Sequence, residues 1–129
     1  MNISTPISAG ELLDKLSIVK IKLEKMSDES KLALISIEEK LLSEISNELL
    51  SEYENKDKRL SELRDVNQKL WVIEDEIRKK EKLKEFDQDF IDLARSVYFT
   101  NDQRFEVKNK INTETGSLIQ EQKSYEEYQ

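Results

Sequence analysis

The chain has 129 residues, enough for one domain that buries about two-thirds of its unfolded surface. Charged residues make up 38% of it and aromatic residues 7%. Only two glycines and one proline are present, too few turn residues for a sheet protein, which predicts an all-α fold. The formal net charge of −7 disfavours a nucleic-acid partner. Histidine and cysteine are absent, which excludes histidine-based catalysis and the usual zinc sites. Acidic pairs such as Asp89 and Asp92 could hold Mg²⁺, but such pairs are common in any acidic helical protein, so we expect no metal and no cofactor.

The first ten residues contain neither the basic region nor the apolar core of a signal peptide. No apolar run approaches the roughly 18 residues that a membrane span requires, so membrane insertion is not expected. The lack of cysteine is compatible with a reducing compartment. Together these features predict a cytoplasmic protein.

The first helix is predicted over residues 9–27, after a short lead-in at 1–7. Ser8 and Glu11 have the spacing of a capping box, in which the serine side chain accepts a hydrogen bond from the Glu11 amide. Apolar residues then recur at intervals of four and three, as on one face of a helix: Leu12, Leu16, Val19, Leu23 and Met26.

The second helix is predicted over 31–54, and its apolar stripe is Leu34, Ile37, Leu41, Ile45 and Leu49. Leu42, Leu50 and Tyr53 widen this apolar face. Because the first two helices are more apolar than one side of a small bundle requires, we expect a homodimer.

The third and fourth helices are predicted over 57–84 and 88–115, with Asp87 as the cap of the fourth. Residues 100–102 either restart this helix or lie within it, and the continuous apolar face favours a single helix. Gly116 is expected to end it in the left-handed conformation, before a polar tail at 117–129. The four segments predict an antiparallel four-helix bundle, in which the last two helices are the longest and form a central hairpin.

Three helices carry polar residues beside their apolar stripes, and these are the candidate site. They are Glu11, Asp14, Lys15, Asn67, Trp71, Glu74, Arg95, Tyr98, Asn101, Asp102 and Arg104. Two interpretations are open. The residues form buried ion pairs and hydrogen bonds that fix helix register, with Trp71 as a core anchor. Alternatively, the arginines hold a phosphorylated or carboxylated ligand, and Trp71 is a stacking platform for a sugar.

Under the structural interpretation, Arg95 is too close to the apolar stripe to be fully solvated. We therefore expect Arg95 to pair with a carboxylate on another helix, for which Glu74 and Asp14 are the candidates. Asp102 is expected to hold a donor from a neighbouring segment. No catalytic residue is predicted.

Two short motifs stand out in the chain: ARSVY at 94–98, followed by Asn101, Asp102 and Arg104, and KSY at 123–125. With these motifs as its most specific elements, the sequence of residues 8–26, 66–81, 86–104 and 111–125 resembles a family of small bacterial proteins known only as a domain of unknown function. Members are often encoded near surface-polysaccharide and glycosyltransferase genes. The family pattern falls on the candidate residues above and on Arg78, Asp87 and Tyr125.

Two functional hypotheses follow. The favoured one is a non-catalytic interaction protein, which the resemblance links to cell-surface polysaccharide biosynthesis. The alternative is an enzyme or binding module for a phosphorylated sugar or nucleotide that uses Arg95, Arg104 and nearby carboxylates. The two differ in whether the polar residues line a solvent-filled cleft or pair with one another in the core.

Overall fold

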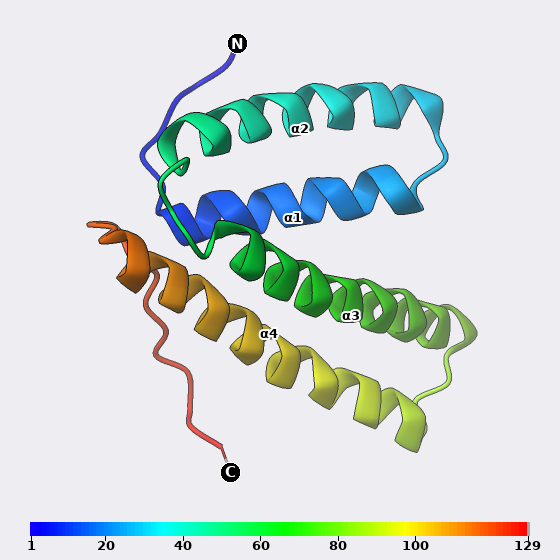
Figure 1. Cartoon of the computed structure of the whole chain (residues 1–129). Coiled ribbons are helices and arrows are strands. Elements are labelled where there is room, and N and C mark those ends of the chain that lie inside the picture. Colours follow the sequence, from blue (N-terminus) through cyan, green and yellow to red (C-terminus); the bar gives the residue numbers. More distant parts are fainter. Residues whose placement is uncertain (129) are drawn as a thin grey trace.

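The computed structural model describes residues 1–128, and within them it contains helices but no strands (Figure 1). The helices are α1 (Ala9–Lys25), α2 (Glu29–Leu49), α3 (Lys56–Leu83) and α4 (Gln88–Thr115). The expected all-α fold is therefore confirmed. Residue 129, the last position of the expected tail, lies outside the described residues.

Side-chain caps begin three of the four helices. Ser8 Oγ accepts from the Glu11 amide at 3.1 Å, and Asp28 and Asp87 cap α2 and α4 in the same way. Each cap satisfies one of the backbone donors that a helix leaves unpaired at its start. Gly116 ends α4 with φ of 67°, in the left-handed conformation expected for it.

The second helix is shorter than predicted, because α2 ends at Leu49 and a turn occupies residues 50–55. Leu50 is buried at this turn, and the Tyr53 hydroxyl donates to Glu114 Oε1 at the end of α4, 2.6 Å away. These two contacts outside α2 hold the turn against the rest of the protein. By contrast, α4 runs unbroken through residues 100–102, with Thr100 buried, which confirms the single fourth helix.

The helix at the centre of the packing is α1. It packs against each of the other three helices, whereas α2 packs only against α1. At the connecting turn, α2 also accepts one hydrogen bond from α3, from Lys56 Nζ to Asn47 Oδ1 at 2.9 Å. Figure 1 shows α2 on the side of α1 that faces away from α3 and α4. The last two helices are the longest, as expected, at 28 residues each, but they do not occupy the central position. The buried core is Leu12, Leu13, Leu16, Val19, Leu50, Leu63, Val107 and Ile111.

The predicted apolar stripe of α2 faces outward. Its side chains are between 42% and 70% exposed: Leu34, Ile37, Leu41, Ile45 and Leu49. The side of α2 against α1 instead contains Ile35, Leu42 and the fully buried Ser46. Helix α2 is therefore apolar on two sides, and residues 1–128 cover only one of them.

Candidate functional site

A buried polar network joins α1, α3 and α4. Its centre is Asp14, which is fully buried on α1. Asp14 Oδ1 accepts from Arg104 Nε and from Asn67 Nδ2, both at 2.9 Å, and its Oδ2 accepts from Arg104 Nη2. Asn67 Nδ2 also donates to Ser17 Oγ at 2.8 Å, and Ser17 donates to the Asp14 carbonyl at 2.7 Å. The carboxylate is thus fully paired despite its burial.

Arg104 lies at the boundary between this network and the solvent. Its side chain is 29% exposed, whereas that of Asp14 is 1% exposed. The hydrogen bonds to Asp14 raise the pKa of Arg104 further above its ordinary value, so the guanidinium is charged at every working pH. Its third nitrogen, Nη1, donates to no residue among 1–128.

A second ionic cluster holds the C-terminal segment against α1 and α4. Lys108 is 7% exposed, and its Nζ lies 2.9 Å from Glu11 Oε2 and 2.5 Å from Glu121 Oε2. Burial alone lowers the pKa of Lys108, but the carboxylates of Glu121 and Glu11 raise it by more, so the net shift is upward. Lys108 therefore carries its charge in a nearly closed position between two partners.

The close approach of α1 to α4 depends on Gly10. Its amide donates to Asn112 Oδ1 at 2.7 Å. A Cβ at this position would lie 2.5 Å from the Lys108 carbonyl oxygen and 2.8 Å from Asn112 Oδ1. Only a residue without a side chain fits, and this contact brings Asp14, one turn further along α1, within reach of Arg104.

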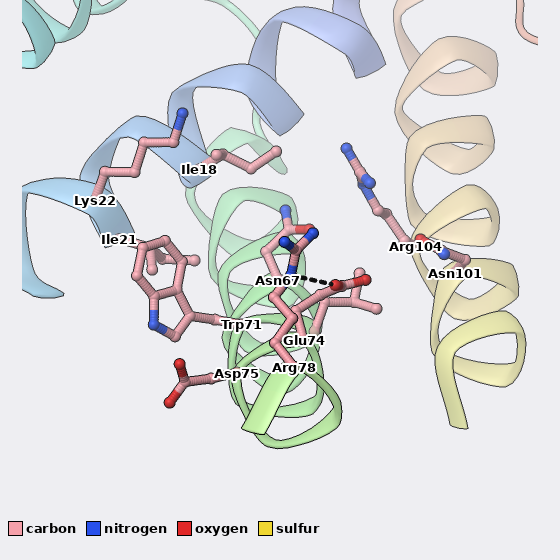
Figure 2. Close-up of a pocket in the computed structure, with 11 residues that line it drawn as sticks. Ile18, Ile21, Lys22, Asn67, Trp71, Glu74, Asp75, Arg78, Asn101 and Arg104 are labelled. Carbon is pink, nitrogen blue, oxygen red and sulfur yellow. Dashed lines mark hydrogen bonds and ion pairs between the residues drawn. The ribbon is translucent and has the colours of Figure 1, made fainter. Parts of the chain in front are cut away.

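A cleft of about 490 Å³ opens between α1, α3 and α4 beside the network. That volume is within the usual range for small-molecule sites. Its apolar lining is Ile18, Ile21, Leu70 and Trp71, and its polar lining is Lys22, Asn67, Glu74, Asp75, Arg78, Asn101 and Arg104. Figure 2 shows these residues around the opening, with α1 and α4 on either side of α3. Glu74 and Arg78 pair with each other at 3.3 Å on the rim.

The C-terminal segment contacts α4 through a different set of residues. The rings of Tyr98, Phe99 and Tyr128 lie together with centroids 4.9–5.3 Å apart. Asp102 accepts from the Tyr128 hydroxyl and lies 3.6 Å from Lys123 Nζ. The expectation that Asp102 holds a donor from a neighbouring segment is confirmed.

A family model described as a family of unknown function, DUF6165, matches residues 3–128. The chain belongs to the DUF6165 family. The match includes residues 28–60, in which the sequence alone showed no resemblance. No curated protein and no solved structure matches the chain.

In this DUF6165 chain, the cleft brings together five of the eleven candidate residues: Asn67, Trp71, Glu74, Asn101 and Arg104. Asp14 lies behind Arg104, and Glu11 binds Lys108. Lys15 is exposed, and its Nζ lies 3.9 Å from Glu11 Oε1 on the same helix. Tyr98 and Asp102 are part of the contact with the C-terminal segment. The interpretation of Trp71 as a core anchor is wrong, because the indole is only partly buried and lines the cleft.

The predicted partners of Arg95 are also wrong. Arg95 is exposed and forms no ion pair within the described part of the chain; its guanidinium carbon lies 5.8 Å from the centroid of the Phe99 ring. Asp14 is bound by Arg104, and Glu74 is bound by Arg78. The reason is helical geometry: Arg95 and Arg104 are nine residues apart, about two and a half turns, so they lie on opposite faces of α4.

Sequence reasoning missed Ser17, Lys22 and Asp75. Ser17 could have been found, because it is a small polar residue one turn after Asp14 and next to the apolar Leu16. Lys22 and Asp75 resemble the other solvated charges of the chain, and nothing in their spacing separates them. Within residues 1–128, no group of three or more acidic side chains is placed to hold a metal ion, and no helix is both long and apolar enough to cross a membrane.

Proposed function

We propose that the protein is a non-catalytic interaction protein that pairs with a second copy of itself through α2. The observation that carries this proposal is the uncovered apolar stripe of α2, which consists of five large aliphatic side chains on one helix. Contiguous apolar surface of this kind marks interaction sites in soluble proteins. A cytoplasmic role as an accessory of cell-surface polysaccharide assembly is part of the proposal, and its link to polysaccharides rests on the sequence resemblance alone.

The pattern of the stripe suits a copy of the same helix. Ile37 and Ile45 lie four residues to either side of Leu41, so the stripe is nearly symmetric about its centre. In an antiparallel pair centred on Leu41, Leu41 faces its own copy and Ile37 faces Ile45. Such self-complementarity is the requirement for a two-fold interface.

The charges beside the stripe also favour a second copy. Lys40 and Glu44 are exposed and lie on the same edge of the stripe, one turn apart. In the same antiparallel pair, Lys40 of each copy lies along the axis between Lys40 and Glu44 of the other, two residues from each. Its long side chain can therefore reach Glu44 of the other copy, which forms two equivalent pairs of opposite charge. Complementary charges of this kind fix the register of an interface.

The phosphorylated-ligand alternative receives less support. It required Arg95 and Arg104 to act together, but the two guanidinium groups lie on opposite faces of α4, and Arg104 already binds a buried carboxylate. A phosphate group therefore has no pair of free arginines to bind it.

Sedimentation velocity at micromolar concentration tests the proposal. The parent chain is expected to sediment as a dimer and Leu41→Glu as a monomer, because a carboxylate at the centre of the interface is buried without a partner. Val72→Glu is the matched control, since Val72 is 54% exposed on α3, close to the 48% of Leu41. A parent chain that sediments as one copy, or dimers that persist in Leu41→Glu, would contradict the proposal.

A further inference from the structure

The cleft between α1, α3 and α4 presents one aromatic face. Trp71 is the only tryptophan of the chain, and its indole lies on the α1 side of α3, near Ile21 (Figure 2). The residue is partly exposed and lines the cleft together with Leu70. Its indole N–H donates to no residue among 1–128. Covering the ring in the core would have been favourable, so a partly open indole in a cleft is a surface available for a flat or apolar ligand face.

Three polar groups that line the same cleft retain unused hydrogen-bonding capacity. Asn67 is 6% exposed, and its amide nitrogen is occupied by Asp14 and Ser17, but its oxygen accepts no hydrogen bond within the described residues. The side-chain amide of Asn101 also has no partner there. With Arg104 Nη1, the cleft offers both acceptors and donors, held in place by the Asp14 network.

The charges of the cleft balance. Its cations are Lys22, Arg78 and Arg104, and its lining carboxylates are Glu74 and Asp75, while Asp14 is bound directly to Arg104 as the third anion. An anionic ligand would need an excess of positive charge, and a cationic one an excess of negative charge. Neither excess is present, which favours an uncharged ligand.

We infer that this cleft binds a neutral saccharide. A pyranose ring has an apolar C–H face that can lie on the indole of Trp71. Its hydroxyl groups both donate and accept, which matches the oxygen of Asn67, the amide of Asn101 and the free nitrogen of Arg104. The inference is independent of the α2 interface, because the cleft contains no residue of α2.

The test uses the labelled full chain on an array of neutral and anionic glycans, followed by titration calorimetry with the neutral glycan that binds best. In the parent chain, binding is expected to change the fluorescence of Trp71, since no other tryptophan contributes. Trp71→Ala and Asn101→Ala are expected to weaken binding about tenfold or more. Val72→Ala is the matched control, because this neighbour of Trp71 is exposed outside the cleft and its loss should leave affinity unchanged.

Circular dichroism melts of each variant separate loss of binding from loss of folding. If Trp71→Ala does not fold, glycan binding is measured in Asn101→Ala and Trp71→Phe instead. Trp71→Phe is expected to retain part of the affinity for the glycan, because phenylalanine keeps an aromatic face. The inference is overturned if no neutral glycan binds, if only anionic glycans or inorganic phosphate bind, or if binding survives unchanged in the folded cleft variants.

Discussion

Arg104 on α4 binds Asp14 on α1 through two nitrogen–oxygen contacts, although the two residues are 90 positions apart in the sequence. Because Asn67 on α3 binds the same carboxylate, one buried charge connects three helices. A buried ion pair adds little net stability by itself, but removal of one partner leaves the other charge unpaired. The pair therefore specifies how α1, α3 and α4 are arranged.

Arg104→Ala is expected to lower the free energy of unfolding by about 3 kcal/mol, because Asp14 then remains buried without its counter-ion. This loss of stability is at the low end for buried ion pairs, because the Arg104 side chain is 29% exposed. In the variant, water can therefore replace some of the hydrogen bonds that Arg104 donates to Asp14. Urea denaturation followed by circular dichroism measures the change.

The comparison variant for Arg104→Ala is Arg95→Ala on the same helix. Arg95 has no ion-pair partner in the described chain and lies only against the Phe99 ring, so its loss should lower the free energy of unfolding by no more than about 1 kcal/mol. Equal denaturation midpoints for the two variants would show that the Asp14–Arg104 pair does not hold the helices together.

Gly10→Ala should destabilise the protein by about 2–3 kcal/mol, because the added methyl group collides with α4 backbone and forces α1 outward. Gly116→Ala provides a contrast, because no atom lies within 4 Å of the position that its Cβ would occupy. The only destabilisation expected is that of a left-handed backbone conformation for alanine, about 1 kcal/mol. Thermal melts of the two variants measure both losses of stability, and the melting temperature should fall further for Gly10→Ala than for Gly116→Ala. A Gly10→Ala variant as stable as the parent would mean that α1 and α4 are not closely packed at this point.

The stability of the end of α4 should depend on pH through Glu114. Its carboxylate accepts from Arg59, Tyr53 and Asn55, and Arg59 above all lowers its pKa from 4.5 to about 2. Because the folded pKa is below the unfolded one, the contribution of Glu114 is full above pH 4.5 and is lost as the pH falls toward 2.

Glu114→Gln should therefore have a lower melting temperature than the parent chain at pH 7. The two melting temperatures should converge as the pH approaches 2. Glu52→Gln is the control, because Glu52 is exposed and has no described partner. A difference between Glu114→Gln and the parent that stays constant with pH would refute the assigned role of the carboxylate.

Capping signals and apolar periodicity were sufficient to locate all four helices, because these signals are local. Ser8, Asp87 and Gly116 act within one turn of the positions they define. The end of α2 was misplaced because it depends on Tyr53, whose hydroxyl binds a carboxylate 61 residues away. No local pattern contains that contact.

The candidate site was predicted only in part, because the sequence shows where a residue lies on its own helix but not which residues of other helices it meets. Position on a helix identified Asp14, Asn67, Trp71 and Arg104 as polar or aromatic residues beside apolar stripes, and they do lie at the network or the cleft. Which arginine faces Asp14 depends on the rotation of α4, and the sequence does not determine that rotation. For α2, periodicity identified an apolar face but not the neighbour, if any, that covers it.

Pairing of α2 with a second copy is the central claim, and thiol crosslinking tests it most directly because the chain has no cysteine of its own. Single cysteines at positions 37, 41 and 45 are introduced as Ile37→Cys, Leu41→Cys and Ile45→Cys and treated with a short bismaleimide. Leu41→Cys alone is expected to give a covalent dimer, and Ile37→Cys should crosslink efficiently only when mixed with Ile45→Cys. If Leu41→Cys gives no more dimer than the exposed control Val72→Cys, α2 does not pair with its copy.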